Sequence, residues 1–286
     1  MLGIVLPLLS SVCWGSADFV GGMLSRRLPA LTVVAVSQLT GGITVLLVAA
    51  ALAEPLPAQV WLPFLGGVVG ALGLVFFYSG LAAGTMSVVA PIAACGAVLP
   101  VAYSIAVGQV PRPLVTAGLV SALVGVVLAS LGTGVEAEGP EPRRPRRAVA
   151  AAVGAAFCFG VFLLCLGRAS ASSPHSELWL AAAARAGSLP TLAVLVIASR
   201  TPPPWRSLKV RDLGPIIAVG LADVTANTLF LFGSSAGTLA VSSVLASLYP
   251  IATVLLARLV LKERVGRVQG AGAALAMLGV VLVSAG

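Results

Sequence analysis

Apolar residues run along this chain in ten long stretches, separated by short polar segments. A transmembrane helix needs about 20 consecutive, mainly apolar residues. The pattern predicts helices at residues 2–24, 31–52, 61–82, 85–106, 113–132, 148–167, 178–198, 213–233, 237–260 and 266–285. Nearly every stretch is apolar on all sides, whereas helices on the surface of a large soluble protein carry a polar face. We therefore expect an all-α polytopic membrane protein with ten transmembrane helices.

Composition agrees with this class and argues against others. Hydrophobic residues make up 59% of the 286 residues and charged residues 9%. A net charge of +8 would suggest nucleic-acid binding in a soluble domain. Here the basic residues lie at helix ends and in short loops, where membrane insertion places them, so we expect no nucleic-acid partner. The four cysteines form no CxxC motif and the single histidine, His175, lies in a loop. We expect no metal site and no cofactor.

The second half of the chain repeats the first. An offset of 153 positions takes Phe77, Gly80 and Val88 to Phe230, Gly233 and Val241, and similar offsets relate other short matches in the same order. We expect a first repeat at 1–132, a polar Pro- and Arg-rich linker at 133–147 and a second repeat at 148–286. Five helices per repeat is an odd number, so the repeats must be inverted in the membrane. In such transporters the substrate site lies near the midplane, where the halves meet.

Basic residues predict the orientation. Fourteen Lys and Arg residues lie in or beside the loops that follow the first, fifth, seventh and ninth predicted helices. The opposite side has only Arg112 and Arg168. Because cytoplasmic loops carry the excess of Lys and Arg, we expect a multi-pass protein of the cytoplasmic membrane with both termini extracytoplasmic.

Several short motifs resemble the EamA family of the drug/metabolite transporter (DMT) superfamily. They are Trp14-Gly15-Ser16, Tyr249-Pro250, Leu261-Lys262-Glu263-Arg264, Gln269-Gly270 and Gly279-Val280, with Ser173-Pro174, Glu177 and Arg185 at the start of the second repeat. The resemblance covers the whole chain and implies a ten-helix carrier that moves small metabolites, often by export, without ATP hydrolysis.

The chain departs from the family pattern in places. Gln109 stands in the first repeat where Glu263 stands in the second, and Gln38 lies near the position that corresponds to Arg185. Many members also keep both termini in the cytoplasm, against the charge count, which we follow for this chain.

Three ionisable residues stand out within the predicted helices: Asp18, Arg185 and Asp223. Such groups cost about 2.5–3.5 kcal/mol each on insertion scales, so they face the bundle interior. Asp223 lies at the centre of its helix and Asn227 follows on the same face. Together they either bind an amine or accept a coupling proton, or Asp223 pairs with Arg185 to hold two helices together.

Each neighbouring residue has a structural and a functional interpretation. Arg185 snorkels to the surface, pairs with an aspartate, or binds a substrate carboxylate. Asp18 lies nearer a helix end, where Arg26 and Arg27 can solvate it. Trp14, one turn earlier, forms an aromatic wall for a cation or packs among lipids and helices.

Other residues suggest a cavity wall, gates or close packing. Tyr78 and Tyr249 carry hydroxyl groups in apolar helices and either line a cavity or pack between helices. Pro91, Pro100 and Pro250 lie within predicted helices, where proline removes a backbone hydrogen bond. The resulting kinks act as gates or are packing irregularities. Glycines such as Gly66, Gly70, Gly118 and Gly125 permit close helix contacts.

The leading functional hypothesis is a secondary-active transporter of small organic metabolites that works by alternating access and exports amino acids or related compounds. The alternative is efflux of hydrophobic cationic drugs, which acidic side chains acting without Arg185 would favour; a channel is a third option. No Walker, HExxH or GxSxG motif is present, so we expect no enzyme. A small-molecule substrate and the lipid bilayer are the expected partners. A coupling proton at Asp18 or Asp223 and a homodimer are left open.

Overall fold

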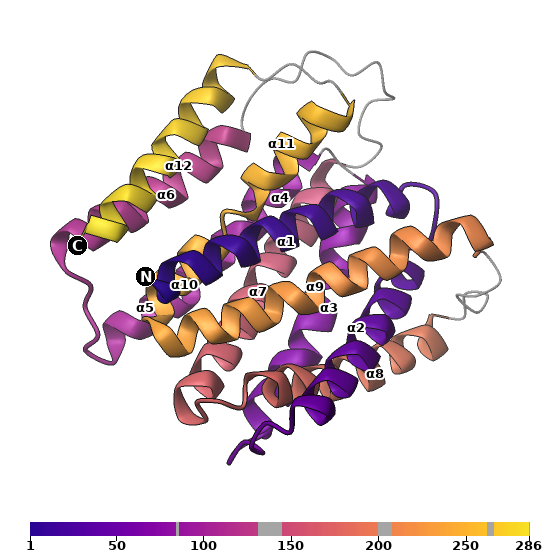
Figure 1. Ribbon diagram of the computed structural model, residues 1–286. Coiled ribbons are helices and arrows are strands. Elements are labelled where there is room, and N and C mark those ends of the chain that lie inside the picture. The colour runs from indigo at the N-terminus through magenta and orange to yellow at the C-terminus, as the bar shows by residue number, and fades with distance from the viewer. Residues whose placement is uncertain (84–85, 131–144, 200–207, 262–265, 286) are drawn as a thin grey trace.

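The computed structural model describes residues 1–286 except 84–85, 131–144, 200–207, 262–265 and 286. The described residues form a bundle of helices without strands (Figure 1). A helix satisfies its backbone hydrogen bonds internally, which is why long apolar segments adopt this structure in a bilayer. In chain order the elements are α1 (Leu2–Ser25), α2 (Ala30–Leu52), α3 (Trp61–Ala83), α4 (Met86–Ala94), the 3₁₀ turn η1 (Cys95–Ala97), α5 (Val98–Ala106), α6 (Pro113–Ser130), α7 (Pro145–Ser172), α8 (Glu177–Ala198), α9 (Val210–Ala236), α10 (Leu239–Ala246), α11 (Tyr249–Leu261) and α12 (Arg267–Ala285).

Every predicted apolar stretch coincides with one of these helices or with a consecutive set of them. By length and composition, seven of the described helical segments can cross a membrane: α1, α2, α3, α7, α8, α9 and the continuous stretch Val89–Ala106. The segments Pro113–Leu128, Leu239–Thr253 and Gly270–Val283 are apolar but shorter. The all-helical membrane architecture is therefore confirmed, whereas the count of ten spans stays a prediction.

Two stretches predicted as single helices are interrupted. The first divides into α4, η1 and α5, and the second into α10 and α11. Proline has no backbone N–H, so Pro100 and Pro250 cannot donate to the carbonyl four residues earlier. Each proline instead lies in the first turn of the helix after the interruption, where no intrahelical donor is needed. Pro91 lies inside α4.

Close helix pairs join the two halves of the chain. A Cβ atom built on Gly118 of α6 would lie 2.8 Å from the carbonyl oxygen of Gly279 in α12. One built on Gly125 would lie 2.7 Å from the carbonyl oxygen of Gly272. Rising numbers in α6 thus meet falling numbers in α12, so the two helices are antiparallel, and glycine is what lets their backbones approach. The pair lies along one side of the bundle (Figure 1).

Three further pairs between the halves are also antiparallel. Along α1 and α9, Gly3 lies beside Gly237 and Trp14 beside Asp223. Along α3 and α7, positions 66, 70 and 73 contact positions 165, 162 and 159 in turn. Along α2 and α8, position 38 contacts position 188 and position 54 contacts position 178. The interior between these pairs holds large buried side chains such as Phe77, Phe230 and Leu166.

The outer surface is apolar too. Leu39, Ile43, Leu46 and Leu47 of α2 are each at least half exposed. A soluble protein would not leave such a row facing water, but the hydrocarbon of a bilayer suits it.

Candidate functional site

A cavity of about 70 Å³ lies where the helices of the two halves meet. Helices α1, α2, α3, α4, α7, α8, α9, α10 and α11 all contribute to its wall, together with η1. Its lining includes Trp14, Asp18, Gln38, Leu74, Phe159, Arg185, Ser188, Asp223, Asn227, Ser247 and Tyr249. The volume is enough for a few water molecules or a small polar group of a solute.

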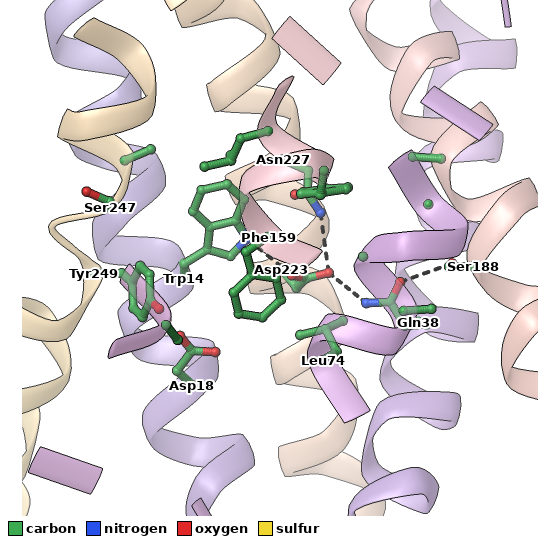
Figure 2. A pocket seen from close by; sticks show the side chains of 18 of the residues that line it. Trp14, Asp18, Gln38, Leu74, Phe159, Ser188, Asp223, Asn227, Ser247 and Tyr249 are labelled. Atoms are coloured by element: carbon green, nitrogen blue, oxygen red, sulfur yellow. Dashed lines mark hydrogen bonds between the residues drawn. The ribbon is translucent and has the colours of Figure 1, made fainter. Parts of the chain in front are cut away.

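Asp223 is the centre of a hydrogen-bond network beside this cavity (Figure 2). Its Oδ2 atom accepts from Arg185 Nη2 at 2.7 Å, from Gln38 Nε2 at 3.0 Å and from Asn227 Nδ2 at 3.4 Å. Its Oδ1 atom accepts from Trp14 Nε1 at 3.2 Å. A buried ion pair is tolerated only where further hydrogen bonds offset the loss of hydration, and these neutral donors provide them.

Gln38 bridges the ion pair. Its Oε1 atom accepts from Arg185 Nη1 and from Ser188 Oγ, the latter at 3.2 Å, while its Nε2 atom donates to Asp223. Neither Gln38 nor Ser188 is among the site residues that the sequence predicts. A signal was present for Gln38, because an amide in an otherwise apolar helix lies near the position that matches Arg185.

The structure places Arg185 in the interior and not at the surface. The residue is 6% exposed and its guanidinium pairs with Asp223. Its Nε atom is buried and has no hydrogen-bond partner among the described residues, and the same holds for Oδ1 of Asn227. Two polar atoms beside the cavity therefore have unused hydrogen-bonding capacity.

Asp18 lies in the cavity wall without a partner. It is 8% exposed, and within the described part of the chain its carboxylate makes no hydrogen bond or ion pair. In Figure 2 it lies below the Trp14 and Tyr249 rings and outside the dashed network around Asp223. Arg27, at the end of α1, instead approaches Asp212 of α9 at 3.7 Å.

Aromatic rings form much of the remaining wall. Trp14 packs against Phe230, with ring centroids 6.1 Å apart, and Tyr249 packs edge-on against Phe77 at 6.2 Å. The Tyr249 hydroxyl donates to the carbonyl oxygen of Ala90 at 3.3 Å, which links α11 to α4.

Tyr78 lies away from the cavity lining. It is 2% exposed in the core, against the backbone of Gly21, where a Cβ atom would collide with its ring.

Both helix interruptions face the cavity. Ala94, the last residue of α4, and Ala97, the last residue of η1, line it, and Ala246 and Ser247 line it where α10 ends. Pro100 and Pro250 each lie a few residues beyond these positions, and Pro91 lies just before the first of them.

The charges in the cavity do not balance. Arg185 and Asp223 neutralise each other, which leaves the Asp18 carboxylate. Burying an unpaired charge is costly, so this position requires a proton or a cationic group.

No cluster of three or more His, Cys, Asp or Glu side chains that could hold a metal ion occurs among the described residues.

Comparisons with known proteins agree with this arrangement. The model of the EamA-like transporter family matches residues 1–131 and 146–285. A solved structure described only as "Crystal structure of protein" superposes with a TM-score of 0.72 at 17% sequence identity, covering 99% of this chain and 96% of that chain. At that identity the likeness shows the fold alone. No curated protein sequence matches.

The family matches fall on the two predicted repeats and span nearly the whole chain. They confirm the resemblance found in the sequence, and they make the chain a multi-pass membrane transporter and not an enzyme. The chain belongs to the EamA-like transporter family.

Proposed function

We propose that this protein is a secondary-active carrier that exports a small organic solute with an ammonium group, such as an amino acid or a related amine, across the cytoplasmic membrane. The observation that carries the proposal is the unpaired Asp18 carboxylate in a cavity walled by aromatic rings. An ammonium group bound there restores the charge balance that the buried aspartate lacks.

The walls of the cavity suit the same chemistry. A cation within about 6 Å of a Trp or Tyr ring face is attracted to the ring, more strongly where water is excluded. Trp14 is one turn from Asp18 on α1, and Tyr249 lines the cavity from α11. The apolar side chains of Leu74, Ala94 and Phe159, which also line the cavity, suit the uncharged part of a small solute.

A second candidate function is efflux of hydrophobic cations, and the pairing of Arg185 favours it. An amino acid also carries a carboxylate, whose natural partner here is the Arg185 guanidinium. That group is already bonded to Asp223 and Gln38. Export of amino acids thus requires the solute carboxylate to use the free Nε atom of Arg185 or to displace Asp223, whereas a cation without a carboxylate needs only Asp18.

We propose that the protein works by alternating access. Ten spanning helices would form two inverted five-helix repeats. Corresponding helices from the two halves, α6 with α12 and α2 with α8, run antiparallel. A two-fold axis that relates antiparallel helices lies across them, in the membrane plane, and this supports inversion. The cavity lies between the halves, where rocking of one repeat against the other would open it to each side in turn.

Proton coupling follows from the same carboxylate. We propose that Asp18 takes up a proton when the solute leaves, because an empty cavity would otherwise hold an unpaired charge. The proton and the solute then compete for one site, and a proton gradient drives export. The uneven basic loops support a placement with both termini outside the cytoplasm.

The test begins with a growth screen of toxic amino-acid analogues and cationic drugs, with and without expression of the protein. The best solute is then measured in proteoliposomes, by exchange of labelled for unlabelled solute. We expect Asp18→Asn to abolish exchange while the protein stays folded. Asp212→Asn, which changes a buried carboxylate at the start of α9, is the control and should retain exchange. Wild-type exchange by the Asp18→Asn variant would contradict the proposal.

Comparing solutes separates the two candidates. Amino acids that are exported better than their decarboxylated amines favour the first, and the reverse order favours efflux of cations.

A further inference from the structure

Two further carboxyl groups, those of Glu54 and Glu177, lie outside the cavity, where the chain leaves α2 and where α8 begins. Glu177, the first residue of α8, is 2% exposed. Its Oε2 atom is buried, and its carboxyl group has no hydrogen-bond partner among the described residues. Glu54, two residues after α2 ends, reaches the same helix terminus. Its Oε2 atom accepts from the backbone N–H of Leu178 at 3.0 Å.

The segment after α2 is held to α8 by this contact and one more. Trp179 Nε1 donates to the carbonyl oxygen of Glu54 at 3.1 Å. The backbone turns sharply on both sides of the contact. Ala53 (φ 49°) and His175 (φ 67°) both have left-handed backbone conformations, which residues other than glycine rarely adopt. These turns bring Glu54 onto the first turn of α8, at the end of the bundle where α1 also begins.

The two carboxylates differ in their hydrogen-bond partners. Both lie at a helix N-terminus, where a negative charge is favourable, but Glu54 alone of the two accepts a bond there, from the Leu178 N–H. Glu177 makes no such bond and is more deeply buried, so its charge is not compensated. Partial burial raises the pKa of the Glu54 carboxyl group, and the neighbouring Glu177 charge raises it further, against the lowering effect of the Leu178 N–H.

No cation on the neighbouring elements balances the pair. Of the described titratable groups on the elements beside this contact, His175 is exposed on the turn before α8. Arg168 of α7 is also exposed, and its guanidinium lies over the Tyr103 ring, 5.4 Å from the centroid. The adjoining ends of α3 and α9 carry no charged residue among those described.

We propose that Glu54 and Glu177 together bind one proton, and that this proton keeps the segment after α2 closed on the first turn of α8. The protonated carboxyl group gains a donor and loses its charge, so the two groups can stay together at this helix end. Loss of the proton leaves two anions at one helix end, and their repulsion releases Glu54 from α8. The site is separate from the cavity and does not depend on which solute the protein carries.

The experiment uses the purified full-length protein in detergent. We expect the melting temperature of the wild type to fall by several degrees as pH rises from about 5 to 8, because the folded protein keeps the proton of the pair to a higher pH than the unfolded chain does. Glu177→Gln, which keeps the shape of the residue but cannot ionise, should remove part of this fall. The part that Asp18→Asn removes belongs to the cavity carboxyl group. Glu54→Gln, which removes one of two repelling charges, should shrink it. Asp212→Asn changes a buried carboxylate at the opposite end of the bundle and should leave the fall in place.

Two further measurements test whether the bound ligand is a proton and whether the segment after α2 leaves α8 when it is lost. Infrared spectra should show a protonated-carboxyl band that disappears with rising pH in the wild type and is missing in Glu177→Gln. With the other three tryptophans changed to phenylalanine, Trp179 emission should shift to longer wavelength as pH rises, and this shift should be absent when Glu177→Gln is added. A melting temperature independent of pH, with no band that Glu177→Gln removes, would overturn the proposal. So would recovery of wild-type stability at high pH by sodium but not potassium, because the ligand would then be a metal cation.

Discussion

The Asp223–Arg185 pair allows charge chemistry at the cavity to be separated from helix packing. Asp223→Asn keeps the shape of the side chain and most of its acceptor capacity but removes the negative charge. In the wild type the two groups are 2.7 Å apart and each side chain is about nine-tenths buried. The substitution therefore leaves a buried guanidinium that cannot lose its proton.

We expect Asp223→Asn to destabilise the protein strongly and Arg185→Gln to destabilise it less. Removing one partner of a buried ion pair costs about 3–5 kcal/mol, which we expect for Asp223→Asn. Arg185→Gln leaves Asp223 with the neutral donors of Trp14, Gln38 and Asn227, and the carboxylate can also take up a proton. We therefore expect a loss of about 1–3 kcal/mol there. The double variant leaves no unpaired charge, so its loss should fall well below the sum of the two single losses.

Unfolding of the purified variants in denaturing detergent measures stability, and solute exchange in proteoliposomes measures function. If Asp223 contributes to the solute site, the double variant should be folded but inactive. If the pair only joins α8 to α9, the double variant should regain both folding and exchange. Full exchange by the double variant would refute a role for this pair in transport. Equal stability of Asp223→Asn and the wild type would refute the ion-pair magnitude itself.

Three other predictions use positions outside the network. In a thermal melting assay, Gly118→Val should destabilise the protein by about 1–3 kcal/mol, because its Cβ would lie 2.8 Å from the Gly279 carbonyl oxygen. Gly214→Ala, with no atom within 4 Å of its Cβ, should be neutral or slightly stabilising in that assay. Tyr249→Phe should cost about 0.5–1.5 kcal/mol in denaturant unfolding through loss of the hydrogen bond to Ala90, and an unchanged stability would show that this bond contributes nothing. A reporter that is active only in the cytoplasm should be silent when fused at Gly286, and strong activity there would show that the count of basic residues predicts the wrong orientation.

The apolar stretches and the buried charges were predictable from the sequence for one physical reason. Lipid excludes unpaired polar groups, so segment lengths follow the bilayer and ionisable residues within them must turn inward. Asp18, Arg185 and Asp223 stand far apart in the chain, yet all three line one cavity. Glycine positions also predicted where helices pack closely: Gly66 and Gly70 lie against α7, and Gly118 lies against α12.

Helix rotation is what the sequence could not specify. In a soluble helix the polar face identifies the outside, but here both the lipid-facing and the buried faces are apolar. Tyr78 and Tyr249 are therefore alike in sequence, although Tyr249 lines the cavity and Tyr78 packs against Gly21. The same ambiguity hid the role of Gln38, whose contact with Arg185 depends on how α2 is turned toward α8. A polar residue in such a helix shows that it needs a partner, and only the packed structure identifies which one.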